Sequence, residues 1–431
     1  MDTKAWGEWS MRLLVLAALL FAAPLSAQTA MEVHEAERTA QGLGELRPGA
    51  GGNPGDANPA NSDEARVGSY TVPPLFERPA QQTRAGWPAR REELARLVED
   101  NWVGRIPETV AGFRLLWTKR AEGAASEHWI GQVVTADGRM GPCVDAIITF
   151  PAGARAAPAL IDYTYIWPGG RAPAFTAPGE PLPPNPVQFA LARGWAHVAY
   201  RPQLLQADTA ATMREGIIGL AHWPRAANDW GALRAWAWGA SQLREELARD
   251  PRINPRRISL VGHSRFGKGV LVAAAFDHEF ADALVSSAGA GGSKLMRRDF
   301  GERWENMAGP SAFHWFTPAI MRYAEGQRTV QDLPIDAHTL IALRAPRPLF
   351  ISSGLAERGD AWADPAGMWT AFSLAQPAWE LFGASVPQGG MPVAQSLEQA
   401  RYPLGWYQHG EGHVPWPAWG AFYDHAERFA D

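Results

Sequence analysis

The stretch ISLVGHSRFGKGVLVAAA, Ile258–Ala275, decides the fold of this chain. It begins with an apolar run, Ile258–Val261, and ends with an Ala-rich run, and Gly262, Ser264 and Gly267 lie between them. The first run indicates a buried strand and the second a helix. A serine at such a seam either caps an ordinary helix or sits on a sharp turn that leaves no room for neighbouring side chains. On such a turn its hydroxyl is raised above the sheet edge, beside the free amides of the helix.

Strand and helix patterns alternate along most of the chain. After a helix pattern that begins at residue 87 and ends before Pro107, apolar segments rich in β-branched and aromatic residues predict strands. A mixed aromatic and basic region at 293–340 is expected to be an insertion. This alternation predicts a mostly parallel, twisted sheet with helices on both faces, and with the Ser264 turn it predicts the three-layer α/β-hydrolase fold. The expected strands are 113–121, 127–136, 144–153, 157–167, 194–202, 256–264, 281–289 and 345–354, and 404–413 is a short strand that leads into a turn. The other expected helices are 226–250, 266–277, 363–383 and 417–430.

The N-terminal residues predict export. Arg12 precedes a short apolar core and PLSAQ follows it, which is the layout of a secretory signal peptide cleaved after Ala27. We expect residues 28–65, rich in Gly, Pro, Asn and Asp, to be a disordered arm. Residues 66–431 then form one catalytic domain. The mature protein is predicted to be periplasmic or secreted and to keep no membrane anchor.

Composition excludes several classes of partner and cofactor. The net charge of −5 does not favour nucleic acid. Cys143 is the single cysteine, so no internal disulfide can form. Most of the histidines are scattered and no cysteine cluster is present, so we expect no metal. No Gly-rich phosphate loop follows the first strands, and we expect no cofactor.

The order of polar residues after Ser264 is that of a catalytic triad. Serine is a poor nucleophile at neutral pH and needs a histidine to take its proton and a carboxylate to orient that histidine. In this fold the acid follows the serine and the histidine comes last. The strand at 345–354 leads into three acidic candidates, and HGEGH supplies two histidines after the last strand: Glu357, Asp360 and Asp364, then His409 and His413.

At these residues the chain resembles the glucuronoyl esterases of carbohydrate esterase family 15. GHSRFGK is similar to the family's Gly-Cys-Ser-Arg-x-Gly-Lys, with His263 in place of Cys. Other segments resemble the family in the same order, so that the resemblance covers nearly all of 65–431. They are YTVPPLF at 70–76, WGALRAWAWGASQL at 230–243, SAGAGG at 287–292, RRDFGE at 297–302, GDAWADP at 359–365 and GEGH at 410–413.

The resemblance implies a role for each matching residue. Ser264 would be the nucleophile and His413 the general base. Arg265 would stabilise the oxyanion with its backbone N–H and its guanidinium. Three further residues would contact the glucuronate: Lys268, Glu302 and Trp362. Glu302 could instead be an ordinary surface carboxylate, and Trp362 a packing residue.

The acid is the position at which this chain departs from the family pattern. Many relatives carry it in a Glu-Ser-Gly-x-Gly-Gly segment, where this chain has Ser287. The acid is therefore expected after the strand at 345–354, and the GDAWADP match implies Asp360. Asp364, beside Pro365, reads as a helix N-terminal residue, and Glu357 is a second alternative.

Three hypotheses about function follow. The first is an exported serine esterase that hydrolyses (4-O-methyl-)glucuronic acid esters, as in lignin–carbohydrate or glucuronoxylan material, so that its partner is a small or polysaccharide-linked glucuronate ester. The second is another carbohydrate esterase of the same fold, such as an acetyl xylan esterase. The third is a catalytically inactive carbohydrate-binding homologue, suggested by Ser287 at the acid position.

Overall fold

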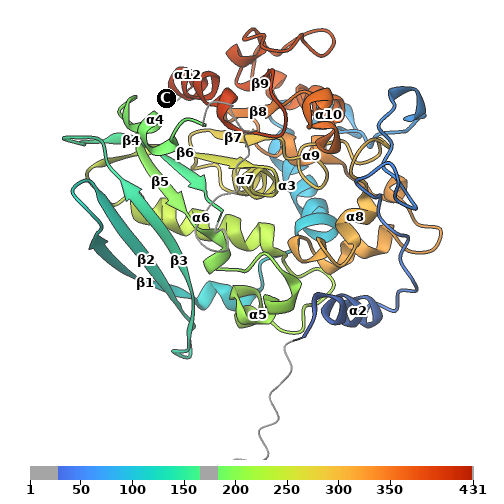
Figure 1. Ribbon diagram of the computed structural model, residues 1–431, viewed down its shortest axis with the longest axis horizontal. Helices are drawn as coiled ribbons and strands as arrows, with labels where there is room; N and C mark the ends of the chain where they lie inside the picture. Colours follow the sequence, from blue (N-terminus) through green and yellow to red (C-terminus); the bar gives the residue numbers. More distant parts are fainter. Residues whose placement is uncertain (1–27, 166–182, 430–431) are drawn as a thin grey trace, which may run out of the picture.

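The computed structural model describes residues 28–165 and 183–429. Within them one nine-stranded sheet runs through the molecule in the order β1-β2-β3-β5-β4-β6-β7-β8-β9 (Figure 1). The pairs among β1, β2, β3 and β5 are antiparallel, and those from β5 through β4 to β9 are parallel. The strands are β1 (Arg114–Ala121), β2 (Ser126–Val134), β3 (Met140–Thr149), β4 (Ala157–Tyr163), β5 (Ala196–Tyr200), β6 (Ile253–His263), β7 (Ala283–Ser286), β8 (Leu349–Ser353) and β9 (Leu404–Gln408).

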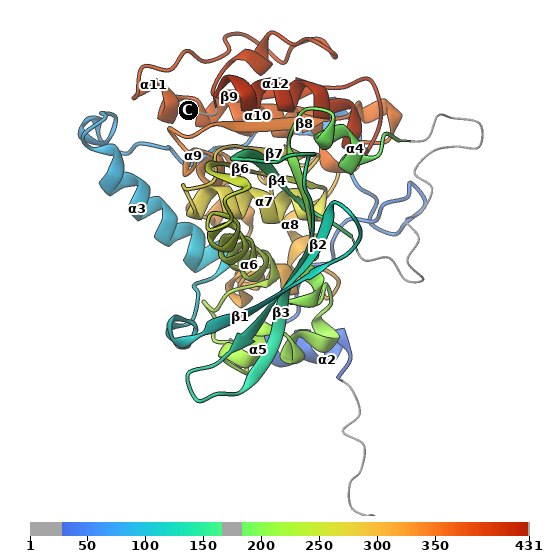
Figure 2. The same cartoon turned by 90° about the vertical axis from the view of Figure 1, so that its left-hand side faces the viewer.

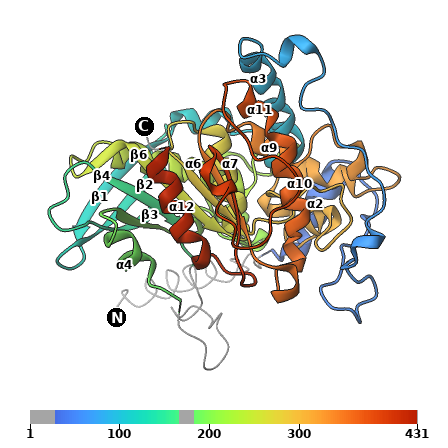
Figure 3. The same ribbon diagram turned by 90° about the horizontal axis from the view of Figure 1, so that it is seen from above.

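Helices cover both faces of the parallel strands. α12 lies on one side of the sheet, and α6 and α7 lie on the other (Figures 2 and 3). The predicted α/β-hydrolase architecture is confirmed. The helices are α2 (Ala30–Ala40), α3 (Trp87–Val98), α4 (Pro186–Leu191), α5 (Ile217–Ala221), α6 (Ala232–Leu247), α7 (Arg265–Phe276), α8 (Trp304–Ala308), α9 (Ala337–Ala342), α10 (Pro365–Ala375), α11 (Pro377–Glu380) and α12 (Trp419–Arg428).

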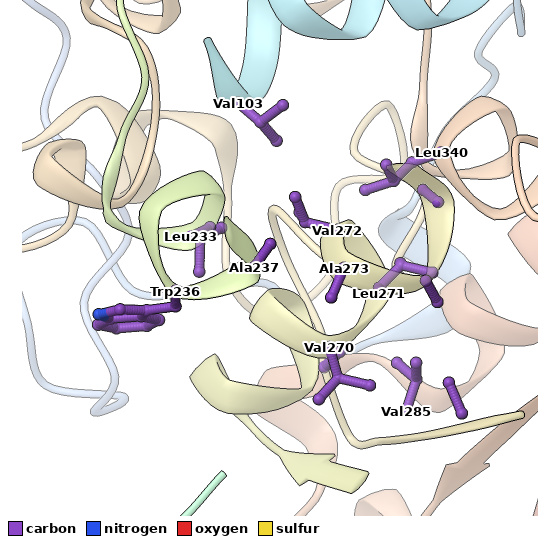
Figure 4. Close-up of a cluster of buried hydrophobic side chains, with 14 of the residues drawn as sticks. Val103, Leu233, Trp236, Ala237, Val270, Leu271, Val272, Ala273, Val285 and Leu340 are labelled. Carbon is purple, nitrogen blue, oxygen red and sulfur yellow. The ribbon is translucent and has the colours of Figure 1, made fainter. Parts of the chain in front are cut away.

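The two faces of the sheet have separate apolar cores, because successive side chains of a strand point to opposite sides. On β7, Leu284 packs in the smaller cluster with Phe422 of α12, whereas Val285 belongs to the larger cluster. Figure 4 shows the larger cluster around α7, with Leu233 of α6 and Leu340 of α9 on either side. α7 is therefore held rigidly behind the turn that contains Ser264.

The prediction of a disordered arm at 28–65 is wrong. Residues 30–40 form α2, which begins with a capping box between Thr29 and Glu32. Glu37 of this helix accepts two hydrogen bonds of 2.7 Å from the fully buried guanidinium of Arg225. The residues after α2 are rich in Gly and Pro, so the average composition of residues 28–65 predicts disorder even though the segment contains the short amphipathic helix α2. Buried ion pairing and packing then supply the stability that composition did not predict.

Two other expectations are refined. The helix expected at 363–383 begins at Pro365 and is divided into α10 and α11, because Pro377 cannot donate a backbone hydrogen bond inside a helix. The insertion at 293–340 lies between β7 and β8 and consists of short helices and loops. The predicted signal peptide lies outside the described residues. Among the described residues, no helix combines the length and apolar character that crossing a bilayer requires.

Candidate active site

The turn between β6 and α7 has the geometry of a nucleophile elbow. Ser264 has φ 57° and ψ −126°, a conformation that costs a residue other than glycine about 1–3 kcal/mol. A β-carbon on Gly262 would lie 2.4 Å from the carbonyl oxygen of Phe266, and one on Gly267 would lie 2.9 Å from that of Ser286. Both positions therefore require glycine, as the sequence predicted.

The alternative of an ordinary capping serine is wrong. Ser264 occupies the N-cap position of α7, but among the described residues its side chain accepts no capping hydrogen bond. Instead the Tyr165 hydroxyl donates a 3.0 Å hydrogen bond to the carbonyl oxygen of His263 and lies beside the serine. Burial raises the pKa of Tyr165 to about 12. The charge of Arg265 and a hydrogen bond with the Ser264 side chain both act in the opposite direction and limit this rise. The hydroxyl of Ser264 is thus not committed to the helix.

Asp360 and His413 meet as predicted. His413 Nδ1 lies 2.7 Å from Asp360 Oδ1. Asp360 is fully buried, whereas the His413 side chain is 39% exposed. The second carboxylate oxygen of Asp360 accepts hydrogen bonds from Ser287 Oγ (2.8 Å) and from the Gly354 amide (2.7 Å). The carboxylate is therefore fixed in orientation, with one oxygen left for the histidine.

The two alternative acids do not reach His413. Asp364 caps α10 by accepting from the Gly367 amide at 2.9 Å, and it pairs with Arg298 Nε at 2.9 Å. Glu357 lies on an exposed short turn with no ion pair among the described residues. Ser287, which stands where relatives carry the acid, is a hydrogen-bond donor to Asp360. This contact explains how a serine can occupy that position without leaving the aspartate unsupported.

Arg265 is held by a buried carboxylate that the sequence analysis did not single out. Its Nη1 donates to Asp208 Oδ2 at 2.6 Å. The other oxygen of Asp208 accepts from Trp315 Nε1 at 2.6 Å and lies 3.1 Å from His314 Nε2. Burial alone would raise the pKa of Asp208, but the hydrogen bond of His314 and the charge of Arg265 hold it below its ordinary value. Asp208 is therefore ionised at neutral pH.

Trp315 also brings the two cations of the motif together. The Arg265 guanidinium lies 5.4 Å, and the Lys268 ammonium 5.7 Å, from the centroid of its ring. Lys268 Nζ donates to the Ala288 carbonyl oxygen at 2.8 Å and lies 3.9 Å from Glu302 Oε2. Burial lowers the pKa of Lys268, while the charge of Glu302 opposes that shift. The predicted sugar contacts Lys268 and Glu302 thus face each other.

Trp362 adjoins the same group through its backbone. The Glu302 amide donates a 3.1 Å hydrogen bond to the Trp362 carbonyl oxygen. The Trp362 side chain is 36% exposed, although large aromatic side chains are usually buried. A purely packing role for Trp362 does not explain this exposure.

His263, which replaces the family's cysteine, lies against His413. The two ring centroids are 4.4 Å apart, and His263 Nδ1 is 3.1 Å from Ser286 Oγ. Burial, reinforced by the neighbouring His413, holds the pKa of His263 well below its ordinary value. A neutral ring therefore packs beside His413 without adding a competing charge.

Sequence reasoning missed Asp208, His314 and Trp315 because none belongs to a spaced motif. Asp208 lies in the loops after β5, and the two aromatic residues belong to the insertion at 293–340. The aromatic character of the insertion was the available signal, but it could not indicate which aromatic side chain lies beneath Arg265.

A sheet of this topology, a strained serine turn and an aspartate–histidine pair define the α/β-hydrolases. Residues 134–383, more than half of the chain, match the family model described as "Glucuronyl esterase, fungi". The structure of a CE15 glucuronoyl esterase from Teredinibacter turnerae T7901 is similar at 32% identity and a TM-score of 0.82, covering 93% of this chain and 99% of that one. A glucuronoyl esterase from Solibacter usitatus is similar at 27% identity and a TM-score of 0.71, covering 85% and 99%. This chain therefore belongs to the glucuronoyl esterase family, carbohydrate esterase family 15.

Two of the curated relatives match over a shorter region. Carbohydrate esterase MZ0003, from an unknown prokaryotic organism, is 38% identical over 157 residues, which are 36% of this chain and 34% of the relative. The 4-O-methyl-glucuronoyl methylesterase of Hypocrea jecorina is 34% identical over 167 residues, 37% of this chain and 35% of the relative. The chain thus spans about a third of the length of these relatives.

Proposed function

We propose that this protein is an exported serine esterase that hydrolyses esters of (4-O-methyl-)glucuronic acid. One observation carries the proposal. Asp360 and His413 are paired at 2.7 Å, in the chain order expected after an elbow serine, in a member of the glucuronoyl esterase family. The relatives' names indicate the substrate class, and the paired carboxylate and imidazole supply the base that an acyl transfer needs.

In the proposed acylation step, the hydroxyl oxygen of Ser264 bonds to the ester carbonyl carbon while His413 takes the hydroxyl proton. The negative charge that develops on the carbonyl oxygen is stabilised by the backbone N–H and the guanidinium of Arg265. Asp360 holds the His413 tautomer and compensates the imidazolium charge. The carbonyl then re-forms, the ester bond breaks, and His413 gives its proton to the departing alcohol.

Deacylation repeats these steps with water as the nucleophile. His413 removes a proton from water as its oxygen bonds to the acyl carbon, and the proton then passes to the departing oxygen of Ser264. The products are free glucuronic acid and regenerated enzyme. No cofactor is needed to balance either step.

Recognition of the sugar is assigned to Lys268, Glu302 and Trp362. Lys268 and Glu302 are a donor and an acceptor that face each other across 3.9 Å, a spacing that suits sugar hydroxyls between or beside them. The exposed indole of Trp362 supplies an apolar face for the C–H groups of a sugar ring. Export rests on the signal-peptide pattern of residues 1–27 and places the enzyme in the periplasm or outside the cell.

Two measurements test the proposal. The first compares release of alcohol from a methyl glucuronate ester with deacetylation of a matched acetylated sugar, and we expect clear preference for the glucuronate ester. Preference for the acetyl ester would instead identify an acetyl esterase. The second is covalent labelling with a fluorophosphonate, which should modify wild type but not Ser264→Ala. No labelling and no hydrolysis would identify a carbohydrate-binding homologue.

A further inference from the structure

A second pocket adjoins the proposed catalytic site. Its volume is about 400 Å³, and its walls come from the N-terminal segment that follows α2 and from the Trp362 turn. Figure 1 shows this N-terminal segment in blue, beside α8 and α10. Asn306 of α8 fixes it by exchanging hydrogen bonds of 3.0 and 2.8 Å with the backbone of Ala50. The segment expected to be disordered thus forms a wall of a defined cavity.

The polar groups of the pocket divide into structural and free ones. Asn61 is buried and satisfied, because Nδ2 donates to the Asp299 carbonyl oxygen at 2.7 Å and Oδ1 accepts from the Asp63 amide at 3.0 Å. Arg66, by contrast, is exposed and makes no ion pair or side-chain hydrogen bond within 28–165 and 183–429. Ser62 is also exposed at the pocket. The cavity thus offers polar side chains with unused hydrogen-bonding capacity.

The aromatic wall is the Trp362 side chain. An exposed indole, together with an unpaired guanidinium and a hydroxyl, matches a sugar ring, which presents C–H groups on its faces and hydroxyls around its edge. A purely aromatic ligand would use the indole but leave the polar groups of Ser62 and Arg66 without partners.

The pocket and the proposed sugar contacts share one wall. The Gly301 amide donates a 2.7 Å hydrogen bond to the Asn61 carbonyl oxygen, and the next amide, of Glu302, donates to the Trp362 carbonyl oxygen at 3.1 Å. Glu302 in turn faces Lys268. A ligand that fills the pocket therefore reaches Trp362, which is also assigned to the glucuronate, and Gly301, which precedes Glu302.

We propose that this pocket binds a sugar residue of the polysaccharide to which the esterified glucuronate is attached. This inference rests on the proposed function, since it extends the same substrate into a neighbouring subsite. The N-terminal segment then acts in substrate selection, and small glucuronate esters leave this subsite empty. Occupancy contributes to binding in both the ground state and the transition state, so it acts on KM more than on kcat.

Filling the pocket provides the sharpest test. A β-carbon on Gly52 would lie 4.0 Å from the nearest carbon of the Trp362 ring, an ordinary contact, so the rest of a leucine side chain can enter the pocket without a clash at Cβ. On Gly55, in the same segment, a β-carbon meets no described atom within 4 Å. Neither glycine has a positive φ. Gly52→Leu is the blocking variant and Gly55→Leu its matched control.

Three methyl or benzyl esters are compared: a methyl ester of glucuronic acid, a methyl ester of a glucuronate-bearing xylo-oligosaccharide, and a benzyl ester of glucuronic acid. For Gly52→Leu we expect KM for the oligosaccharide ester to rise about tenfold with unchanged kcat. KM for the small methyl ester should rise far less, because the leucine approaches the Trp362 ring at Cζ3 and leaves the rest of the indole to the glucuronate. Gly55→Leu should behave as wild type. Arg66→Ala, which removes no ion pair or side-chain hydrogen bond among the described residues, should raise the same KM by about three- to tenfold.

Each outcome separates the two proposals. If wild type hydrolyses the small methyl ester but Gly52→Leu and Arg66→Ala change no oligosaccharide constant, the subsite is refuted while the proposed function stands. A selective effect on the benzyl ester would also refute it and assign the pocket to the alcohol. If wild type hydrolyses none of the esters, the proposed function itself fails. Melting temperatures of both leucine variants that equal the wild-type value establish that the fold is intact.

Discussion

Asp208→Asn tests whether the buried carboxylate behind Arg265 matters to the proposed reaction. The substitution keeps the shape of the side chain but places an NH₂ group where Oδ2 now accepts the 2.6 Å hydrogen bond from Arg265. Donor then faces donor, and the guanidinium loses its anchor. The contacts of Trp315 and His314 to the other oxygen can persist. The perturbation is therefore directed at Arg265.

The magnitude follows from the environment of the pair. A hydrogen bond between charged groups is worth about 1.5–3 kcal/mol, and because the Arg265 side chain is 43% exposed we reduce this to about 1–2 kcal/mol. If the whole of this energy is lost from the stabilisation of the transition state, kcat falls about 5- to 30-fold. Removing the guanidinium in Arg265→Ala should cost more, about 10²–10³-fold.

Steady-state kinetics on a methyl glucuronate ester supply the assay. KM should change little, and in the double variant Asp208→Asn/Arg265→Ala the rate should equal that of Arg265→Ala, since Asp208 acts through Arg265. Asp145→Asn is the matched control, because Asp145 is another buried aspartate paired with an arginine and a histidine, Arg201 and His128. Two strands separate its strand, β3, from β6. Asp145→Asn should lower the melting temperature but leave kcat unchanged.

The opposite electrostatic argument defines the refuting result. Asp208 partly neutralises the charge of Arg265, so its removal could strengthen the field at the oxyanion. If Asp208→Asn matches or exceeds the wild-type kcat, or if its effect adds fully to that of Arg265→Ala, Asp208 does not position Arg265.

Four further predictions concern the triad, the sugar contact and stability. Ser264→Ala should lower the rate about 10⁶-fold with an unchanged circular dichroism spectrum, and a variant that keeps a tenth of the activity would place the nucleophile elsewhere. Asp360→Asn should reduce kcat about 10⁴-fold and Ser287→Ala, which removes one donor to that carboxylate, about tenfold; a silent Asp360→Asn would contradict the assignment. Lys268→Ala should mainly raise KM, whereas a fall in kcat at constant KM would place it at the oxyanion. Burial, aided by Arg91, lowers the pKa of His278 to about 4. Below about pH 6.5 the unfolded chain therefore binds more protons than the folded protein. The contribution of His278 to the free energy of unfolding is complete above that pH and should fall by about 2 kcal/mol from pH 7 to pH 5. In urea unfolding, His278→Gln should show a flatter dependence of this free energy on pH.

Local sequence was informative where a backbone constraint acts within a few residues. Gly262 and Gly267 could be assigned from the sequence because the strand-to-helix turn leaves no room for a β-carbon. Alternating apolar segments likewise predicted the strands and the layers. The average composition of residues 28–65, by contrast, led to a wrong prediction of disorder. A helix of eleven residues and one buried ion pair order this segment despite its high content of Gly and Pro.

The choice among the acids shows where local information ends. Asp360 and Asp364 are four residues apart in one loop, and both are buried carboxylates. Chain order and resemblance favoured Asp360, but only the contacts separate the two. Asp360 faces His413, Ser287 and Gly354, whereas Asp364 faces Arg298 and its own helix.

By itself, therefore, the sequence determined the fold class, the elbow serine and the order of the candidate triad, because strand and helix periodicity, glycine at crowded turns and topological order are properties of short segments or of chain direction. The tertiary structure alone decided which carboxylate meets His413, that Asp208 and Trp315 lie behind Arg265, and that the N-terminal segment forms a pocket with Trp362. Those contacts join residues from distant segments, and their existence depends on how the sheet, the insertion and the N-terminal segment pack. No periodicity or spacing along the chain encodes that packing.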